Sequence, residues 1–486
     1  MKNILFIFCF LNSFVFAQTK FNYINSQNLL FTDKILSSEE YEGRLSGSAG
    51  YNKASDFART IMETGGLQPA FGKEFYQYFN VEYNQIFEPN ILNSYSDDSK
   101  TVFHLGKDYV YRGFTGSADF KLPTAFVGYG ISQPEIGYDD YKNIDVTDKV
   151  VIAFKYNPKW KIENENWTDG SPRNKARMAF EHGAKGILFV STPNEENPQK
   201  TIGSILDGEG EQMNNFPSLH ISIDAANIFL KNSGFNLSQL QGKIDLTQKP
   251  FSVNLKTETE IFVKNLYDKE TQTQNIAGIW EGNDASLKNE YIVVGAHLDH
   301  VGKQGNIYFP GANDNASGSS VVLNMIKAFS ENNIKTKRSV IFVLFASEEI
   351  GLFGSKYFVQ NLPMPKEKII CMMNFDCVGF GDSIQIGGGK SSPKLWELIN
   401  DVDSQTSRMM VKNTWSGGGA DAEHFYQAGI PTAYFVTTNS YTHLHYMTDT
   451  YETLNPKLFE AVANLGLNSL IKIANGSYVR EEVVKK

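Results

Sequence analysis

The second half of the chain alternates apolar segments with amphipathic ones, and this alternation constrains the fold more than any other feature. The segment "SVIFVLFAS" (339–347) is apolar almost without interruption, as in a strand covered on both faces of a sheet. The segment "GSSVVLNMIKAFSENN" (318–333) carries apolar residues at helical spacing. Strands that alternate with helices predict an α/β fold in three layers with a mixed, mostly parallel sheet.

The same criteria predict further elements on both sides of these two segments. Residues 34–66 are expected to contain a helical segment, "GYNKASDFARTIMETGG", which ends in a glycine pair that suits a helix C-terminus. The remaining predicted strands are 291–297, 368–376 and 430–438, and the remaining predicted helices are 353–362, 393–406, 420–429 and 455–475.

The first half of the chain has a different pattern. Residues 75–130 are rich in aromatic and β-branched residues, which favours β structure. From about 148, "KVVIAFKY" and "RNKARMAFEHGAKGILFVST" predict a strand–helix–strand unit, and "FPSLHISIDAANIFL" predicts a further strand and helix. Residues 101–255 resemble a protease-associated (PA) domain, a β-rich module inserted in several secreted peptidases. The histidines of this half (His104, His182 and His220) are isolated, and we expect structural roles for them.

Composition and length exclude some classes of function. The 486 residues, of which 41% are hydrophobic and 20% charged, describe a globular protein with a large core. The net charge of −9 is spread along the chain, so we expect neither nucleic-acid binding nor attraction to an acidic membrane.

The N-terminus predicts export. "MKNILFIFCFLNSFVFAQ" combines one lysine, an apolar stretch and small residues up to Ala17, as in a signal peptide (1–17) cleaved after that residue. The stretch is too short to be a membrane span. The expected location is periplasmic or extracellular. The expected organisation of the mature chain is 18–100 as the N-terminal part of the α/β domain, 101–255 as the insert and 256–486 as the main part of the α/β domain.

Two cysteines remain in the mature chain, Cys371 and Cys377, and both fall in the segment "IICMMNFDC". Six residues of extended chain span roughly 20 Å. A disulfide needs Cα atoms about 4.4–6.8 Å apart. We therefore predict two free, buried thiols.

Polar residues that could carry chemistry follow the predicted strands, at the edge where ligands bind in such sheets. In "GAHLDHVG", His297 and Asp299 are two apart and point the same way on an extended chain, so Asp299 can orient a metal-binding His297. His300 is expected to point to the opposite side and to be structural. Taken alone, a histidine and an aspartate at this spacing are more often structural.

Three further segments contribute carboxylates. Asp314 lies in the tight loop "PGANDNASG", where a turn or helix-capping role is the alternative. Glu348 and Glu349 follow an apolar strand. Adjacent residues of an extended chain cannot both face one point, so one can bind metal while the other acts as a base; a solvated loop is the alternative. Asp376 ends another apolar strand.

The last segment, "THLHYMTDT" (442–450), contains His443 and His445, with Asp449 four residues after the second. The two histidines are either a metal pair or one ligand and one residue of a substrate pocket. Together, the nitrogen and oxygen donors of all these segments, without cysteine, suit a catalytic zinc site. Five plausible ligands and a spare glutamate are enough for two metals that share a bridging carboxylate.

In this order, "GAHLDHVG", "GANDNASG", "FASEEIGLFGS", "MNFDCVG" and "HYMTDT" resemble the di-zinc aminopeptidase / glutamate carboxypeptidase II family of zinc exopeptidases. The resemblance covers most of the mature chain and implies a phosphorylase/hydrolase-like fold with two Zn²⁺ per chain. It places His297 and Asp376 on one zinc, Glu349 and His445 on the other, and Asp314 between them. It makes Glu348 the general base and Asp299 the partner of His297.

The sequence departs from the family pattern in places. Where many members have a tyrosine that donates to the oxyanion, this chain has Leu444, so Tyr446, Tyr441 and His443 are the alternative donors. The loop "SGGGADAEHF" matches one where relatives carry an acid near the substrate. Asp421 is therefore a candidate substrate-binding residue, together with His443 and Tyr446, and a helix cap is the alternative for Asp421.

The expected function is that of a secreted di-zinc metallopeptidase that removes N-terminal residues of peptides through a metal-bound hydroxide and a glutamate base. No arginine cluster that could bind a substrate carboxylate accompanies the motifs, and Arg408 is the nearest candidate. The alternatives are a carboxypeptidase, a single-zinc glutaminyl cyclase and a non-catalytic binding protein of the transferrin-receptor type. Side-chain preference, oligomeric state and physiological substrate stay open.

Overall fold

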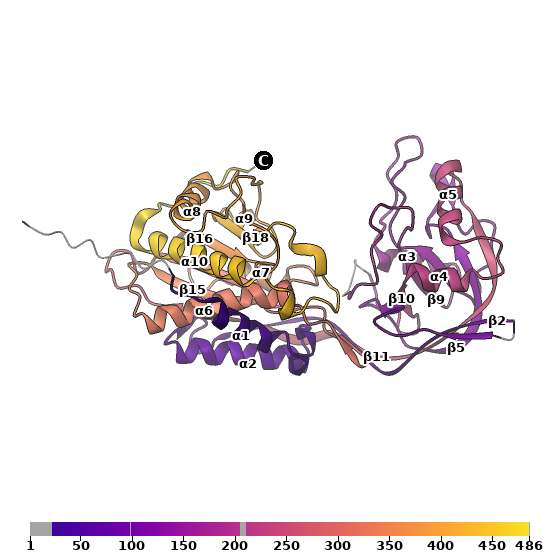
Figure 1. The fold of residues 1–486 in the computed structure, drawn as a ribbon, viewed down its shortest axis with the longest axis horizontal. Coiled ribbons are helices and arrows are strands. Elements are labelled where there is room, and N and C mark those ends of the chain that lie inside the picture. The colour runs from indigo at the N-terminus through magenta and orange to yellow at the C-terminus, as the bar shows by residue number, and fades with distance from the viewer. Residues whose placement is uncertain (1–21, 98, 205–209, 486) are drawn as a thin grey trace, which may run out of the picture.

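A computed structural model describes residues 22–97, 99–204 and 210–485, so the predicted signal peptide lies outside the described residues. The chain forms two lobes joined by the long strands β2 and β11 (Figure 1). We call residues 22–81 and 276–485 the larger lobe and residues 86–263 the inserted lobe, because these segments supply two separate hydrophobic cores. None of the helices in the described ranges is long and apolar enough to cross a membrane.

The larger lobe is built on a mixed sheet with the strand order β17-β18-β16-β12-β15-β11. The four central strands (β18, β16, β12 and β15) are mutually parallel, and the outer two run antiparallel to their neighbours. The mostly parallel sheet predicted from the sequence is confirmed. The strands of this lobe are β1 (Gln68–Pro69), β12 (Tyr291–His297), β13 (Lys303–Gln304), β14 (Ile307–Tyr308), β15 (Ser339–Phe345), β16 (Ile369–Phe375), β17 (Ile384–Gly387) and β18 (Thr432–Thr437).

Helices cover both faces of this sheet. Along β15, Phe342 and Leu344 pack with α1, α2, α6, α8 and α10, whereas Val343 and Phe345 pack with α7 and α9. This alternation explains why the strand is apolar without interruption. The helices are α1 (Ser26–Leu36), α2 (Ala49–Thr64), α6 (Ser317–Glu331), α7 (Phe353–Gln360), α8 (Pro393–Gln405), α9 (Ala422–Gln427) and α10 (Pro456–Lys472).

The inserted lobe continues the same sheet through β11 with the order β5-β8-β9-β10-β4, in which β5, β8, β9 and β10 are parallel. Helix α3 packs on one face, and α4 and α5 pack on the other. Two of these helices, α3 and α4, lie where the sequence predicts helices, and α5 is an additional one in the described part of the chain. Its elements are β3 (Ser99–Val102), β4 (Tyr109–Tyr111), β5 (Ala118–Val127), β6 (Ser132–Gln133), β7 (Tyr138–Asp139), β8 (Val150–Phe154), α3 (Pro172–Glu181), β9 (Gly186–Val190), β10 (Ser218–Ile221), α4 (Ile223–Phe229) and α5 (Leu237–Thr247).

Two strands belong to both lobes. β2 (Tyr76–Ser96) and β11 (Ser252–Trp280) pair antiparallel along most of their length. In β2, Val81 packs in the core of the larger lobe and Ile86 packs in the core of the inserted lobe. In β11, Val263 packs in the core of the inserted lobe and Ile276 packs in the core of the larger lobe. The lobes therefore meet within this antiparallel ladder, which shifts register between Phe262 and Lys264 and between Asp268 and Thr271.

The two described cysteines are free and buried, as predicted. Cys371 lies in β16, but Cys377 lies two residues beyond its end, where φ is +51°, so the two do not share one strand. Burial raises the pKa of Cys371 to about 12 and that of Cys377 well above its ordinary value. Only the thiolate reacts rapidly with thiol reagents.

We expect a thiol reagent such as a disulfide dye to leave the folded mature chain unlabelled. In denaturant, the same reagent should label both Cys371 and Cys377, because unfolding exposes them and restores ordinary thiol pKa values. Absorbance of the released dye measures the labelling. Labelling of the folded chain at the rate of a free thiol would contradict the buried positions of these residues.

Candidate metal centre

The candidate ligands gather at the carboxyl edge of the four parallel strands. His297 is the last residue of β12 and pairs with Phe345 at the end of β15, from which Glu348 and Glu349 follow. Asp376 follows β16, and the loop after β18 carries His445. Asp314, in the loop before α6, completes the group. These residues come from separate segments, and the parallel pairing of the strands brings them together.

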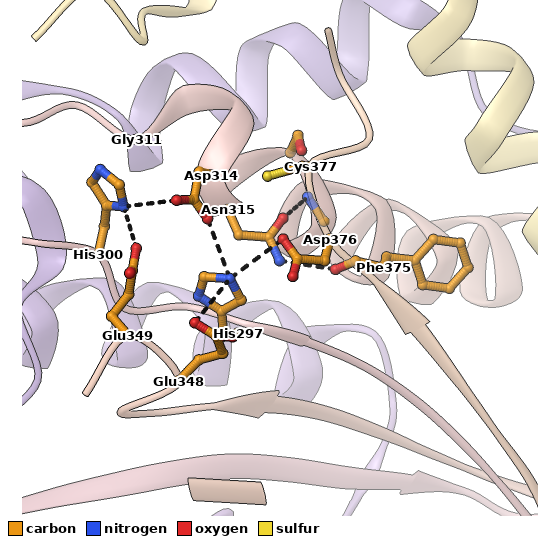
Figure 2. Close-up of polar contacts among 12 residues, drawn as sticks. His297, His300, Gly311, Asp314, Asn315, Glu348, Glu349, Phe375, Asp376 and Cys377 are labelled. Atoms are coloured by element: carbon orange, nitrogen blue, oxygen red, sulfur yellow. Dashed lines mark hydrogen bonds and ion pairs between the residues drawn. The ribbon is translucent and has the colours of Figure 1, made fainter. Parts of the chain in front are cut away.

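Asp314 occupies the middle of the group. Its Oδ1 lies 3.4 Å from His297 Nε2, while its Oδ2 lies 3.2 Å from His445 Nε2 (Figure 2 shows the first contact). The two oxygens of one carboxylate thus face two different histidines. This is the arrangement that a carboxylate bridging two metal ions requires.

The first subsite lies around His297. Its Nε2 is 3.5 Å from Asp376 Oδ1 and 4.0 Å from Glu348 Oε2. Asp376 Oδ2 accepts a hydrogen bond from the Tyr434 hydroxyl at 3.0 Å, but Oδ1 is buried without a hydrogen-bond partner among the described residues. A buried carboxylate oxygen aimed at a histidine nitrogen fits a metal ligand, because a buried polar atom is costly when it has no partner.

The second subsite lies around His445, whose Nε2 is 3.0 Å from Glu349 Oε2. Asp314 Oδ2 and a further histidine nitrogen, His300 Nδ1, complete it, and the ligand atoms of these four residues lie within 4.8 Å of one another. His445 has a left-handed backbone, with φ of +59°. The candidate donors are nitrogen and oxygen atoms, as a catalytic zinc site requires, so the residues present fit two zinc ions.

The expectation that His300 points away from the site is wrong. Its Nδ1 is 2.7 Å from Glu349 Oε1 and 3.6 Å from Asp314 Oδ2, and Figure 2 shows the ring turned toward both. The expectation assumed the alternation of an extended strand. β12 ends at His297, so that alternation no longer applies three residues later.

Glu348 and Glu349 differ in exposure. The side chain of Glu349 is 5% exposed, whereas that of Glu348 is 18% exposed. The backbone N–H groups of both residues donate to the Asp299 carboxylate, at 3.1 Å and 3.3 Å. Asp299 therefore fixes the turn that carries the two glutamates. His297 Nδ1 hydrogen-bonds the carbonyl of Asp299 at 3.1 Å, and the carboxylate oxygen is farther away, at 3.7 Å.

The electrostatics of the cluster reflect crowded carboxylates. Burial opposes protonation of His297, but Glu348 and neighbouring aspartates raise its pKa well above the ordinary value. Burial likewise opposes protonation of His445, but Glu349 and Asp314 raise its pKa. Burial raises the pKa of Glu348, and Glu349 raises it further. Without metal, the cluster thus favours positive charge on His297 and His445, whereas burial lowers the pKa of His300. Metal ions would supply that charge instead.

The predicted substrate-binding residues have different surroundings. Asp421 is fully buried at the start of α9 and makes no capping hydrogen bond, so the capping alternative is not seen. Burial raises its pKa to about 7. His443 is partly exposed, and its Nδ1 shares a hydrogen bond of 2.9 Å with the Thr448 hydroxyl. Tyr446 lines a cleft between the lobes. Tyr441, a further candidate for the missing oxyanion donor, is 55% exposed.

The inserted lobe reaches the metal centre directly. The backbone N–H of Gly203 donates to the carbonyl of His445 at 2.8 Å. A Cβ atom on Gly203 would lie 2.7 Å from the Val301 side chain and 2.8 Å from the Phe309 ring, so a larger residue here would have to displace these side chains. Beside this contact lies a cleft of about 1060 Å³, lined by residues of both lobes that include Lys200 and Tyr446.

The sequence analysis assigned no role to three residues that support the site. The carboxylate of Asp449 accepts from the backbone N–H groups of Asn313 and Asp314, at 2.9 Å and 3.0 Å, and holds the loop of the bridging candidate. Tyr434 donates to Asp376. The buried guanidinium of Arg44 binds backbone carbonyls beside two candidate ligands. Asp449 had a signal, because it is an acid in the same segment as His445.

One family model matches the chain: Peptidase family M28, over residues 275–470. We call the matched residues, 275–470, the M28 domain. Every candidate metal ligand lies inside the M28 domain, together with Glu348 and Asp299. The match begins at residue 275, near the end of β11, and includes none of the inserted lobe.

Curated relatives match part of the chain. Leupeptin-inactivating enzyme 1 of Streptomyces exfoliatus is 32% identical over 181 residues, which are 35% of this chain and 36% of that protein. A probable leucine aminopeptidase of Trichophyton verrucosum is 29% identical over 197 residues, 38% of this chain and 55% of that protein. The chain thus spans about a third and about half of the length of these two relatives.

The fold of both lobes together occurs in solved structures. A zinc aminopeptidase from Bacillus subtilis superposes with a TM-score of 0.64 at 18% identity and covers 96% of this chain and 100% of its own. Similarity at this identity concerns the fold alone. Because the similarity covers nearly the whole chain, both lobes have counterparts in the fold of that structure.

Proposed function

We propose that the chain is a di-zinc metallo-exopeptidase that removes N-terminal residues from peptides. The observation that carries the proposal is the Asp314 carboxylate, whose two oxygens face His297 and His445 on opposite sides. The M28 domain and the aminopeptidases among its relatives support the same reaction. In this proposal His297 and Asp376 hold one zinc, Glu349 and His445 hold the other, and Asp314 bridges them.

The side chains have distinct roles in the proposed reaction. Two zinc ions at this site would lower the pKa of a water molecule and polarise the scissile carbonyl. Glu348, the more exposed glutamate, accepts the proton of the attacking water and gives it to the leaving amine. Its raised pKa favours uptake of that proton. Asp299 holds Glu348 in place through its backbone N–H.

We favour an aminopeptidase, which recognises the free amine of its substrate, over a carboxypeptidase, which recognises the substrate carboxylate. The carboxypeptidase hypothesis needs arginine side chains in the substrate pocket. Arg408, the nearest candidate by sequence, lies exposed at the end of α8 and donates to the carbonyl of Ser404 at 3.1 Å. Arg44 lies near the site, but its hydrogen bonds are made to backbone carbonyls in the core. A cluster of acids beside the metals suits an α-ammonium group.

The cyclase and binding-protein hypotheses predict a different metal content. A glutaminyl cyclase would use a single zinc. The two oxygens of Asp314 face two different histidines, which favours two metal ions. A non-catalytic protein of the transferrin-receptor type would lack ligands, and this chain has a complete set.

We also propose export by the 1–17 signal peptide, and a PA-like role for residues 101–255 between the flanking segments 18–100 and 256–486.

The test is a panel of aminoacyl anilides and dipeptides, each with a free or a blocked N-terminus, assayed with and without a chelator. We expect cleavage of the free substrates alone, loss of cleavage with the chelator, and recovery with added zinc. Cleavage of N-blocked dipeptides would support a carboxypeptidase instead. Two zinc ions per chain by elemental analysis would exclude the single-zinc cyclase.

A further inference from the structure

Arg44 is a buried cation that joins the loops of the metal centre. Its side chain is fully buried, and its four hydrogen bonds all go to backbone carbonyls. Nε donates to Leu298 O at 2.8 Å, and Nη2 donates to Gly311 O at 2.8 Å. Nη1 donates to Pro310 O at 2.8 Å and to Leu36 O, at the end of α1, at 2.7 Å.

The bonded carbonyls flank candidate ligands on both sides of the first subsite. Leu298 stands between His297 and Asp299, and Gly311 opens the loop that carries Asp314. One planar guanidinium thus sets the separation of two loops that must present His297 Nε2 and Asp314 Oδ1 3.4 Å apart. The backbone takes part as well, because the carbonyl of Arg44 accepts from the His300 N–H at 3.1 Å.

The fork geometry explains why arginine suits this position. Guanidinium offers five N–H donors in a rigid plane, whereas a lysine ammonium offers three from a single point. Arg44 donates to four carbonyls from three nitrogen atoms. A guanidinium has enough donors for these four bonds, whereas a lysine ammonium has only three. The charge also acts at a distance: although burial lowers the pKa of Arg44, Asp33, Asp314 and other carboxylates raise it. The same field stabilises those carboxylates in the core.

We infer that Arg44 is a positioning residue that preorganises the metal centre by holding the His297 loop and the Asp314 loop at ligand distance. This inference rests on the metal site proposed above. Groups that orient metal ligands from behind typically change metal affinity about 10–100-fold when altered. Arg44 would act in this way through the backbone, without contact with the metal or the substrate.

The test compares Arg44→Lys with a matched control, Arg338→Lys, in the full mature chain. Arg338 is also buried and donates to two backbone carbonyls, Ile473 O at 2.7 Å and Tyr478 O at 2.9 Å. Arg338 directly precedes β15, at the amino edge of the sheet. The length of β15, about 20 Å, separates it from the metal centre at the opposite edge. Zinc titration of the metal-free proteins against a competing chelator measures affinity, and thermal unfolding measures the cost in stability.

We expect zinc affinity to fall about 10–100-fold in Arg44→Lys and to stay within about twofold of the unaltered chain in Arg338→Lys. Unchanged affinity in Arg44→Lys would overturn the inference, and so would an equal loss in both variants. If the unaltered chain bound no zinc, the proposed metal site itself would be refuted, which is a distinguishable result.

A second variant covers the case in which Arg44→Lys does not fold. Arg44 has a left-handed backbone with φ of +50°, which glycine adopts without strain, so Arg44→Gly removes the side chain and relieves the backbone. We expect millimolar methylguanidinium, but not methylammonium, to restore zinc affinity to Arg44→Gly. Recovery with both compounds, or with neither, would contradict the inference.

Discussion

Replacement of Glu348 by glutamine should reduce peptide hydrolysis by about 10²–10⁴-fold while the chain still binds its metal ions. Glutamine keeps the size of the side chain and its hydrogen-bonding capacity but cannot take up the proton of water. The backbone N–H of Glu348 bonds to Asp299 at 3.1 Å, and this bond does not depend on the side chain, so the turn should persist. Turnover of an unblocked aminoacyl anilide and zinc content by elemental analysis are the two measurements.

Glu397→Gln, on the exposed side of α8, is the matched control, and its turnover should equal that of the unaltered chain. If Glu348→Gln lost zinc together with activity, Glu348 would be a ligand and the division between it and Glu349 would be reversed. Wild-type turnover in Glu348→Gln would remove Glu348 from the proposed mechanism altogether.

Replacement of Asp314 by alanine should affect both proposed metal ions at once. Its Oδ1 faces His297 and its Oδ2 faces His445, so both subsites lose an oxygen ligand. We expect the zinc content to fall well below two per chain and hydrolysis to fall by about 10³-fold or more, since metal ions supply several kcal/mol of charge stabilisation. Titration with zinc and turnover at saturating zinc separate loss of binding from loss of chemistry.

Asp401→Ala, on the exposed end of α8, serves as the control for charge removal. Loss of one zinc with full retention of the second, at unchanged affinity, would show that Asp314 serves a single ion and that no bridge exists. That result would also bring back the single-metal cyclase hypothesis.

The fold of the larger lobe could be predicted because its strands and helices differ in period. β15 reads as a doubly covered strand and α6 as an amphipathic helix, and each lies where the sequence placed it. The candidate ligands could be predicted for a related reason, since an acid or histidine after an apolar strand stands out. Asp376 and Glu349 are examples.

Other features depend on contacts that no local pattern reveals. Arg44 lies 254 positions from Leu298 in the sequence, and a single arginine in an N-terminal segment carries no sign of the carbonyls that it binds. The orientation of His300 depends on where β12 stops, which is a property of strand pairing. The run of β2 and β11 through both lobes likewise follows from their mutual register rather than from their own residues.

The hydrogen bond between Gly203 and His445 has a consequence for how the chain can change. Donor and acceptor are both main-chain groups, so exchange of side chains around them leaves the bond in place, provided that residue 203 stays small. A change in the length of the 195–204 loop, by contrast, would move the donor away. The link between the inserted lobe and the metal centre therefore tolerates divergence of sequence far better than insertion or deletion.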